Sequence, residues 1–289
     1  MKRKGLILVL ALVLIAELLA AGGIFYKTYL GRESKTEGTL NSEKGRPGLL
    51  ASAVRFFDEK EEALEEEETK AAEEKPQLNG LIVAIDPGHQ GAHIDMSAKE
   101  ENAPGSGEMK AKATGGTTGT YTGMPEYQLN LDVSLKVRDL LVERGYQVVM
   151  AREDNDTAIS NKERAQLANE AGADVCVRIH ANGSEDASSQ GALCLVMSPD
   201  NPYVGQLYEE SNKLAENVLH SYCQATGFAD QGVVTNDTMT GLNWSEIPVM
   251  ILEMGFMTNE HDDTKMADVS FQDQMAEGIA EGIDAYFGI

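Results

Sequence analysis

The chain of 289 residues carries 47 acidic and 24 basic side chains, which gives a formal net charge of −23. This charge argues against nucleic acid as a partner, because phosphate backbones are bound by clustered lysine and arginine. Apolar residues make up 42% of the chain, enough for one sizeable core. The three cysteines, Cys176, Cys194 and Cys223, do not have the spacing of a disulfide framework or a thiolate zinc site.

Residues 1–29 form the first predicted segment and have the pattern of an export signal. Basic residues at 2–4 precede a run, residues 5–26, that is apolar except for Glu17. The run slightly exceeds the roughly 20 residues of a membrane helix, which favours an uncleaved anchor with the bulk of the chain outside the cytoplasm. The alternative is a cleaved and secreted form, because residues 20–23 are small enough for a signal peptidase and an acid is costly inside a membrane.

Residues 30–78 are predicted to be an acidic linker. Within them, residues 58–74 carry ten acids and two lysines, so this stretch alone contributes −8 to the net charge. Such a composition favours a solvated helix or a disordered spacer over a packed core. Residues 79–289 then form the predicted globular domain.

Strand patterns alternate with helix patterns through residues 79–289. The predicted strands cover residues 81–85, 146–151, 173–180, 192–197 and 249–253. The predicted helices cover residues 129–141, 161–171, 203–226 and 271–287, the second of them opened by a capping box at Ser160 and Glu163. This alternation predicts a single α/β domain in which helices flank a mainly parallel, twisted sheet.

Three of the predicted strands lead into a side chain able to bind a metal or transfer a proton. The first strand runs into Asp86-Pro87-Gly88-His89, the third ends at His180, and the strand at 249–253 ends at Glu253. Glu126 lies at the start of the first predicted helix. Because sites on such sheets form at the carboxyl ends of the strands, we expect these four side chains to meet at one edge.

Two imidazoles and a carboxylate are a known ligand set for catalytic zinc, which keeps one position open for water. A further carboxylate beside such a centre can accept a proton from that water. The four residues therefore suggest three ligands and one base, an arrangement for hydrolysis. The structural alternatives are a hydrogen-bonded core histidine at either position, an ion pair for Glu253, and a helix-dipole contact for Glu126.

Four segments of the domain carry a resemblance to one enzyme family. They read IVAIDPGHQG (82–91), PEYQLNLDVSLKVRDLL (125–141), RIHANGS (178–184) and VMILEMGFMTN (249–259). Together with the arginine-bearing segment 161–169 they resemble, in order and over residues 80–289, the type 3 zinc-dependent N-acetylmuramoyl-L-alanine amidases of bacterial cell walls.

The resemblance implies one zinc ion per chain, held by His89, Glu126 and His180, with Glu253 as the general base that passes a proton to the leaving amine. It implies peptidoglycan as the partner and, as the bond cleaved, the amide between the lactyl group of N-acetylmuramic acid and L-alanine of the stem peptide. Arg164 and Asn182 are expected to orient the ligands or the substrate.

Residues 90–124, between the first two expected ligands, depart from the family pattern. This insertion is longer than compact members need and is rich in glycine, serine and threonine. Long connections of this kind are usually functional or mobile. The two hypotheses for it are a flap over the substrate groove and an autoinhibitory segment that moves aside.

Two other functions are compatible with the same residues. One is a zinc peptidase or carboxypeptidase on a similar scaffold, acting on a different amide. The other is a wall-binding domain without turnover, which four retained polar side chains argue against, because unpaired buried carboxylates and imidazoles are costly. The sequence identifies no regulatory partner; the membrane is a partner only through residues 1–29, if they are not cleaved.

Overall fold

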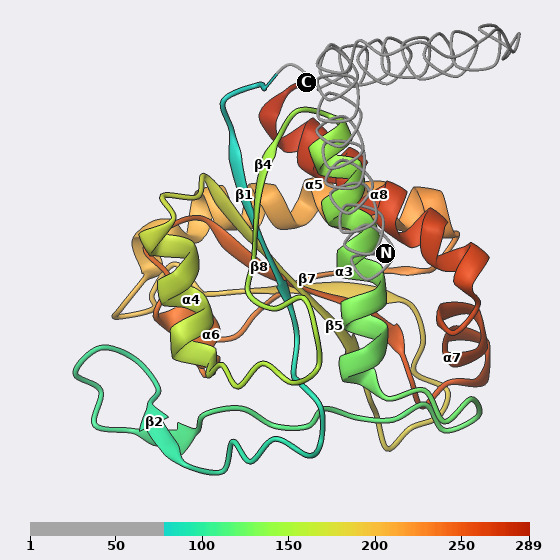
Figure 1. The fold of residues 1–289 in the computed structure, drawn as a ribbon, viewed down its shortest axis with the longest axis horizontal. Helices are drawn as coiled ribbons and strands as arrows, with labels where there is room; N and C mark the ends of the chain where they lie inside the picture. The colour runs from blue at the N-terminus through green and yellow to red at the C-terminus, as the bar shows by residue number, and fades with distance from the viewer. Residues whose placement is uncertain (1–77) are drawn as a thin grey trace, which may run out of the picture. The chain divides into compact units, whose positions relative to one another are not determined.

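The computed structural model describes residues 78–289. The predicted anchor or signal (residues 1–29) and all but the last residue of the predicted linker lie outside the described residues, so both stay predictions. Between residues 78 and 289, no helix combines the length and the apolar character that a membrane span requires. Figure 1 shows the described residues as a sheet with helices packed around it.

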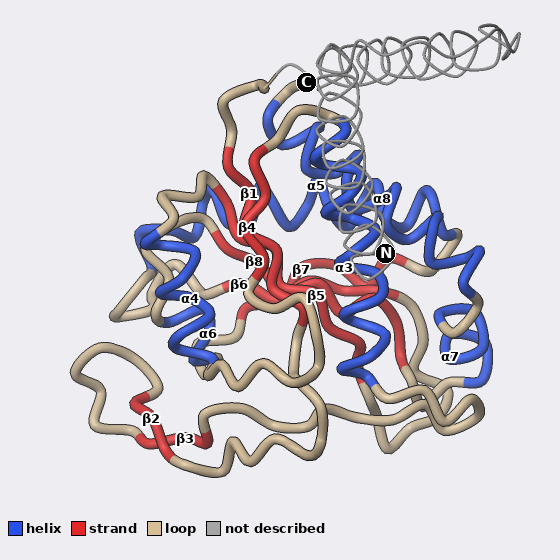
Figure 2. The backbone as a smooth tube through the Cα atoms, viewed as in Figure 1, coloured by secondary structure: helices blue, strands red, loops and turns tan. Residues whose placement is uncertain are grey.

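The centre of the domain is a six-stranded sheet with the order β4-β1-β5-β8-β6-β7. Its strands are β1 (Ile82–Pro87), β4 (Gln147–Met150), β5 (Val175–Asn182), β6 (Ala192–Val196), β7 (Asp230–Thr235) and β8 (Val249–Phe256). Neighbouring strands run parallel, except that β6 is antiparallel to β8. The predicted mainly parallel α/β sheet is therefore confirmed, and Figure 2 shows its twist.

Helices cover the sheet. They are α3 (Glu126–Glu143), α4 (Asn161–Glu170), α5 (Tyr208–Thr226), α6 (Thr240–Asn243), α7 (Glu260–Met266) and α8 (Val269–Phe287), with a 3-10 turn at Gly205–Leu207 before α5. Helix α8 packs against both α3 and α5, and α4 packs against α6. Helix α3 buries Leu129, Val133, Val137 and Leu141, which recur every fourth residue and so form one face.

The capping box predicted at Ser160 and Glu163 is present at the start of α4. Ser160 Oγ accepts from the backbone N–H of Glu163 at 3.1 Å, and Glu163 Oε2 accepts from the N–H of Ser160 at 2.8 Å. Both donors would otherwise lack a partner at the helix start. This capping box fixes the start of α4. Arg164, in the first turn of that helix, then contacts the end of β1.

Strands β5 and β8 extend past their predicted ends. His180 and Glu253 therefore lie inside strands that continue to Asn182 and Phe256. The register pairs His180 directly with Glu253 on these two neighbouring parallel strands. Side chains paired in this way emerge on the same face of a sheet, so the strand pairing itself brings these two residues together.

Several elements were not predicted. Within residues 90–124, β2 (Lys99–Glu101) and β3 (Met109–Ala111) pair as an antiparallel hairpin, which we call the 99–111 hairpin. His261 lies in the first turn of α7, which begins here because Asn259 caps the helix by accepting from two of its N–H groups. Cys176 is a core residue, and burial raises the pKa of its thiol to about 12.

Candidate active site

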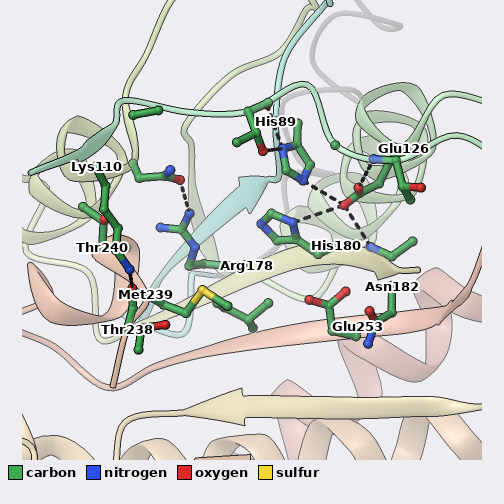
Figure 3. Close-up of a pocket in the computed structure, with 18 of the residues that line it drawn as sticks. His89, Lys110, Glu126, Arg178, His180, Asn182, Thr238, Met239, Thr240 and Glu253 are labelled. Carbon is green, nitrogen blue, oxygen red and sulfur yellow. Dashed lines mark hydrogen bonds and ion pairs between the residues drawn. The ribbon is translucent and has the colours of Figure 1, made fainter. Parts of the chain in front are cut away.

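Three of the four predicted side chains converge on a single point. Glu126 Oε1 lies 3.0 Å from Nε2 of His89 and 3.2 Å from Nδ1 of His180. One ligand atom from each of the three residues lies within 4.8 Å of the others. They come from the turn after β1, the first residue of α3 and the inner strand β5, and Figure 3 shows both rings directed toward one oxygen of the carboxylate.

The turn that presents His89 depends on its neighbours. A Cβ at Gly88 would collide with the ring of His180, so only glycine fits there. His89 itself adopts a φ of 60°, a left-handed conformation that costs a residue with a side chain about 1–2 kcal/mol. Its Nδ1 donates to the backbone oxygen of Thr114 at 2.8 Å, which orients the ring so that Nε2 lies beside Glu126.

Glu126 is buried at the N-terminus of α3, where the helix dipole favours a negative charge. Its Oε2 accepts from the N–H of Thr117 at 2.8 Å, and its Oε1 accepts from the N–H of Ala181 at 3.2 Å. Burial alone would raise the pKa of Glu126, but hydrogen bonding to His180 and His89 outweighs it and holds the pKa well below its usual value. The group is therefore a carboxylate, the form that binds cations.

His180 lies on β5, which has a neighbouring strand on each side in the sheet. Burial lowers the pKa of its ring to about 4, so the imidazole is neutral at pH 7 and offers a lone pair to a metal. Its Nε2 is buried and has no hydrogen-bond partner within residues 78–289. A buried polar atom without a partner is costly unless a ligand satisfies it.

Glu253 lies beside this cluster without joining it. Figure 3 shows its carboxyl group on the side of β8 that faces His180. Burial, reinforced by the negative charge of Glu126, raises the pKa of Glu253 to about 8. Its Oε2 is buried and unpaired among the described residues. A carboxyl group with a pKa near neutrality, next to three metal-type ligands, is suited to exchanging protons.

These side chains line a cavity of about 640 Å³. One wall comes from β5 and β8. The opposite end is formed by the 99–111 hairpin, through Lys99 and Lys110, and by residues 238–241 at the start of α6. The insertion is thus part of the cavity wall, and the cavity is large enough for a drug-sized segment of a substrate.

Arg164 lies in the protein interior, whereas Asn182 lies in the cavity wall. Arg164 is 1% exposed, pairs with Asp86, and donates to the backbone oxygens of Pro87 at 2.6 Å and His89 at 2.7 Å. It lies behind the site and holds the turn that presents His89. Asn182 lines the cavity, with its Oδ1 accepting from the N–H of Gly183 at 2.8 Å.

Two further arginines that sequence reasoning missed support the same turn. Arg178 pairs with Asp86 at 3.1 Å, and Arg152 donates to the backbone oxygen of Gly88 at 2.9 Å. Against the effect of burial, Arg178 and Arg164 hold the pKa of Asp86 well below its usual value. One signal was available for Arg178: it precedes His180 by two residues on a strand, which places both on one face.

Residues 114–122 of the insertion are built into the site. A Cβ at Gly116 would lie 2.6 Å from Oε2 of Glu126 and 2.7 Å from Cδ2 of His89, so the segment passes directly over both. Buried Asp263 of α7 fastens it, accepting from the N–H groups of Tyr121 at 2.7 Å and Thr122 at 2.9 Å. This part of the insertion is therefore a fixed support for Glu126 and His89.

Replacing Arg164 is expected to destabilise the fold. Arg164→Met leaves Asp86 with one cationic partner and removes one donor each from the backbone oxygens of Pro87 and His89, so the free energy of unfolding should fall by about 3–5 kcal/mol. Urea unfolding followed by circular dichroism measures it. The control is Arg138→Gln, which breaks partly exposed ion pairs and should cost less than about 1 kcal/mol. Equal stabilities for the two variants would contradict the support role of Arg164.

Comparison with known proteins places the chain in a family. The N-acetylmuramoyl-L-alanine amidase family (Amidase_3) matches residues 83–285. The amidase LytC of Bacillus subtilis is 30% identical over 186 residues, which are 64% of this chain but 34% of LytC, so the chain spans about a third of that relative. The amidase Rv3717 of Mycobacterium tuberculosis is 26% identical over 217 residues, which cover 72% of this chain and 87% of the relative.

A solved structure agrees with this assignment. The N-acetylmuramyl-L-alanine amidase Ami1 of Mycobacterium smegmatis superposes with a TM-score of 0.66 at 28% identity, over 73% of this chain and 99% of Ami1. The β1 turn, α3, β5 and β8 all lie within residues 83–285, the part of the chain that the family matches. The chain belongs to the N-acetylmuramoyl-L-alanine amidase family.

Proposed function

We propose that this protein hydrolyses the amide between the lactyl group of N-acetylmuramic acid and L-alanine in peptidoglycan, in a zinc-dependent reaction. One observation carries the proposal. Glu253, whose buried Oε2 has no partner within residues 78–289, lies in register with His180 beside three converging ligand atoms in a cavity wall. Family membership supplies the substrate class.

The residues fit a zinc ion. Two imidazole nitrogens and one carboxylate oxygen are a zinc ligand set, and His89, Glu126 and His180 would hold one ion per chain. The Thr114 carbonyl at His89 and the Thr117 N–H at Glu126 are the outer partners that usually fix such ligands. When bound, zinc supplies Lewis-acid activation of water and of the scissile carbonyl.

Glu253 is the proposed catalytic residue. As general base, its carboxylate takes a proton from the water that adds to the lactyl carbonyl carbon. It then gives a proton to the alanine nitrogen as the C–N bond breaks, so that a lactyl carboxylate and a free amine leave. A pKa raised by burial suits a group that must both accept and release a proton. Asn182, lining the cavity, is proposed to orient the substrate.

The reaction products test this proposal. The full chain, loaded with zinc, is incubated with purified muropeptides, and the products are identified by mass spectrometry. Intact stem peptide with a free L-alanine amino group, together with muramic acid ending in its lactyl carboxylate, is the expected result. Loss of a terminal amino acid would instead indicate the carboxypeptidase alternative, and binding without hydrolysis would indicate a wall-binding domain.

We further propose that the enzyme acts outside the cytoplasm, where peptidoglycan lies. Basic residues at 2–4 ahead of an apolar run support export, and the length of that run favours a retained anchor. The acidic residues 58–74 would then act as a spacer between the membrane and the catalytic domain.

Asp263 is expected to control zinc affinity from a distance. Asp263→Ala removes the acceptor of the Tyr121 and Thr122 N–H groups and frees the segment that supports Glu126. Loss of an outer partner typically weakens metal binding about 10–100-fold, and competition with a fluorescent chelator measures this change.

The matched control for that measurement is Asp268→Ala. It removes the N-cap of α8, where Asp268 accepts from the N–H of Ser270 at 2.8 Å, and should cost about 1 kcal/mol of stability. Its zinc affinity should equal that of the wild type. A similar loss of affinity in both variants would mean that general destabilisation, and not the 114–122 segment, causes the effect.

A further inference from the structure

We propose that the hairpin end of the cavity is an anion subsite, formed by Lys99 and Lys110, that binds a carboxylate of the stem peptide. This inference rests on the proposed function, because it assigns one end of the same cavity to one part of the substrate. It would make the two lysines determinants of specificity, at a distance from the groups that carry out the reaction.

Each strand of the hairpin supplies one lysine to the lining of the cavity that holds His89 and Glu126. Strands β2 and β3 pair Lys99 with Ala111 and Glu100 with Lys110, so the two lysines are one register step apart and start from opposite faces of the hairpin. In Figure 3, Lys110 lies beside Thr238 and Thr240, on the far side of Arg178 from the metal-type cluster.

The charges in the cavity are segregated, in contrast to the acidic chain as a whole. Its acidic lining residues are Glu126 and Glu253, and both belong to the cluster or lie next to it. Toward the hairpin the charged lining residues are Lys99, Lys110 and Arg178. A concave surface with one sign of charge and low-dielectric walls concentrates ligands of the opposite sign.

Contacts hold the Lys110 ammonium group in place, but they do not use all of its N–H donors. Its Nζ donates to the backbone oxygen of Thr238, another residue of the cavity lining, and lies 3.7 Å from Oε1 of the exposed Glu108. An ammonium group has three donors, so capacity for a ligand is left. Lys99 is exposed, and its side chain makes no hydrogen bond or ion pair within the described part of the chain. Its charge is therefore available to a ligand.

The positions of the charges in the substrate indicate which part of it binds at the hairpin end of the cavity. N-acetylated sugars are neutral, and the lactyl carboxyl is tied up in the amide that is cleaved. The carboxylates of the substrate lie on the stem peptide. With the scissile amide at the His89, Glu126 and His180 cluster, a cationic subsite at the other end orients the peptide toward the hairpin and the sugar away from it.

The test uses two synthetic stem tripeptides of one sequence, one with free carboxylates and one with carboxamides, and the same pair attached to N-acetylmuramic acid. Calorimetry on the full chain should show the carboxylate tripeptide binding about 5- to 10-fold more tightly. Of the two muramoyl tripeptides, the one with free carboxylates should likewise be cleaved with the higher kcat/KM. In Lys99→Gln/Lys110→Gln the preference should vanish in both measurements, and in the wild type it should shrink as salt rises.

Matched variants distinguish the effect of losing a lysine charge from a general effect on the fold. Lys112→Gln removes one positive charge from the same insertion at a residue that does not line the cavity, and should keep the preference. Lys110→Arg keeps the charge and should also keep it. Lys99→Gln alone, at an exposed position, should reduce it without affecting the fold.

The outcomes for the two claims are distinct. Equal binding of both tripeptides by the wild type, or an unchanged preference in the double variant, would overturn the anion subsite even if the enzyme cleaves both muramoyl peptides. A clear binding preference with no cleavage of either muramoyl peptide would uphold the subsite and refute the proposed reaction.

Discussion

Glu253→Gln is expected to lower turnover by about 10²–10⁴-fold, the contribution typical of a general base. The carboxamide has almost the same shape but cannot accept a proton. Because Glu253 is buried and its Oε2 is unpaired among the described residues, the substitution should leave the free energy of unfolding unchanged or slightly raised. Steady-state cleavage of a muramoyl peptide, with zinc content measured on the same sample, checks the prediction.

The control for this variant is Glu281→Gln, which removes one negative charge from an exposed position on α8. Both variants should hold one zinc ion per chain, and the control should turn over at the wild-type rate. A Glu253→Gln enzyme with turnover within a few-fold of wild type would remove this residue from the base role, whatever its zinc content.

His180→Ala is expected to abolish tight zinc binding and, with it, activity. The substitution deletes one of three converging ligand atoms, so the loss of affinity should exceed the 10–100-fold typical of outer partners. It also leaves Glu126 with fewer partners in a buried place, so stability of the metal-free chain should fall as well. Metal analysis after dialysis against a weak chelator gives the stoichiometry.

The matched histidine is His220, an exposed residue of α5 that contacts Gln224. His220→Ala should retain one zinc ion per chain and full activity. A strong chelator should remove zinc from the wild type and stop turnover, and added zinc should restore it. Stoichiometric zinc in His180→Ala would refute the ligand assignment directly.

The parts of the fold that the sequence predicted are those with strong local patterns. The buried run of β1, the four-residue spacing of Leu129, Val133 and Val137, and the capping box at Ser160 each follow from short-range physics. The candidate cluster also followed from the sequence, because side chains at the carboxyl ends of parallel strands share one edge.

What the sequence could not give depends on partners far along the chain. Strands β2 and β3 have three residues each and no apolar alternation, so they are defined only by pairing with one another. Edge strand β7 has the pattern of a turn, with Asp230 and Gly232, and is fixed by its register with β6. Strand β7 and the 99–111 hairpin were missed for this reason.

The same limit applies within the site. Asp86 was not among the predicted site residues, yet its ion pairs with Arg164 and Arg178 form the buried support beneath the turn that presents His89. No local pattern shows that arginines 78 and 92 residues away converge on it. One part of the insertion, residues 114–122, is fastened to α7 through Asp263, which lies 141 residues from Thr122. The flap and the autoinhibitory segment both stay predictions for the insertion as a whole.

The most direct test of the account is the position of the metal. Crystals of the zinc-loaded protein, measured at the zinc absorption edge, should give one anomalous peak per chain, between His89, Glu126 and His180 and beside Glu253. A peak at any other group of side chains, or a zinc-active enzyme in which these three residues do not contact the ion, would contradict the proposed site.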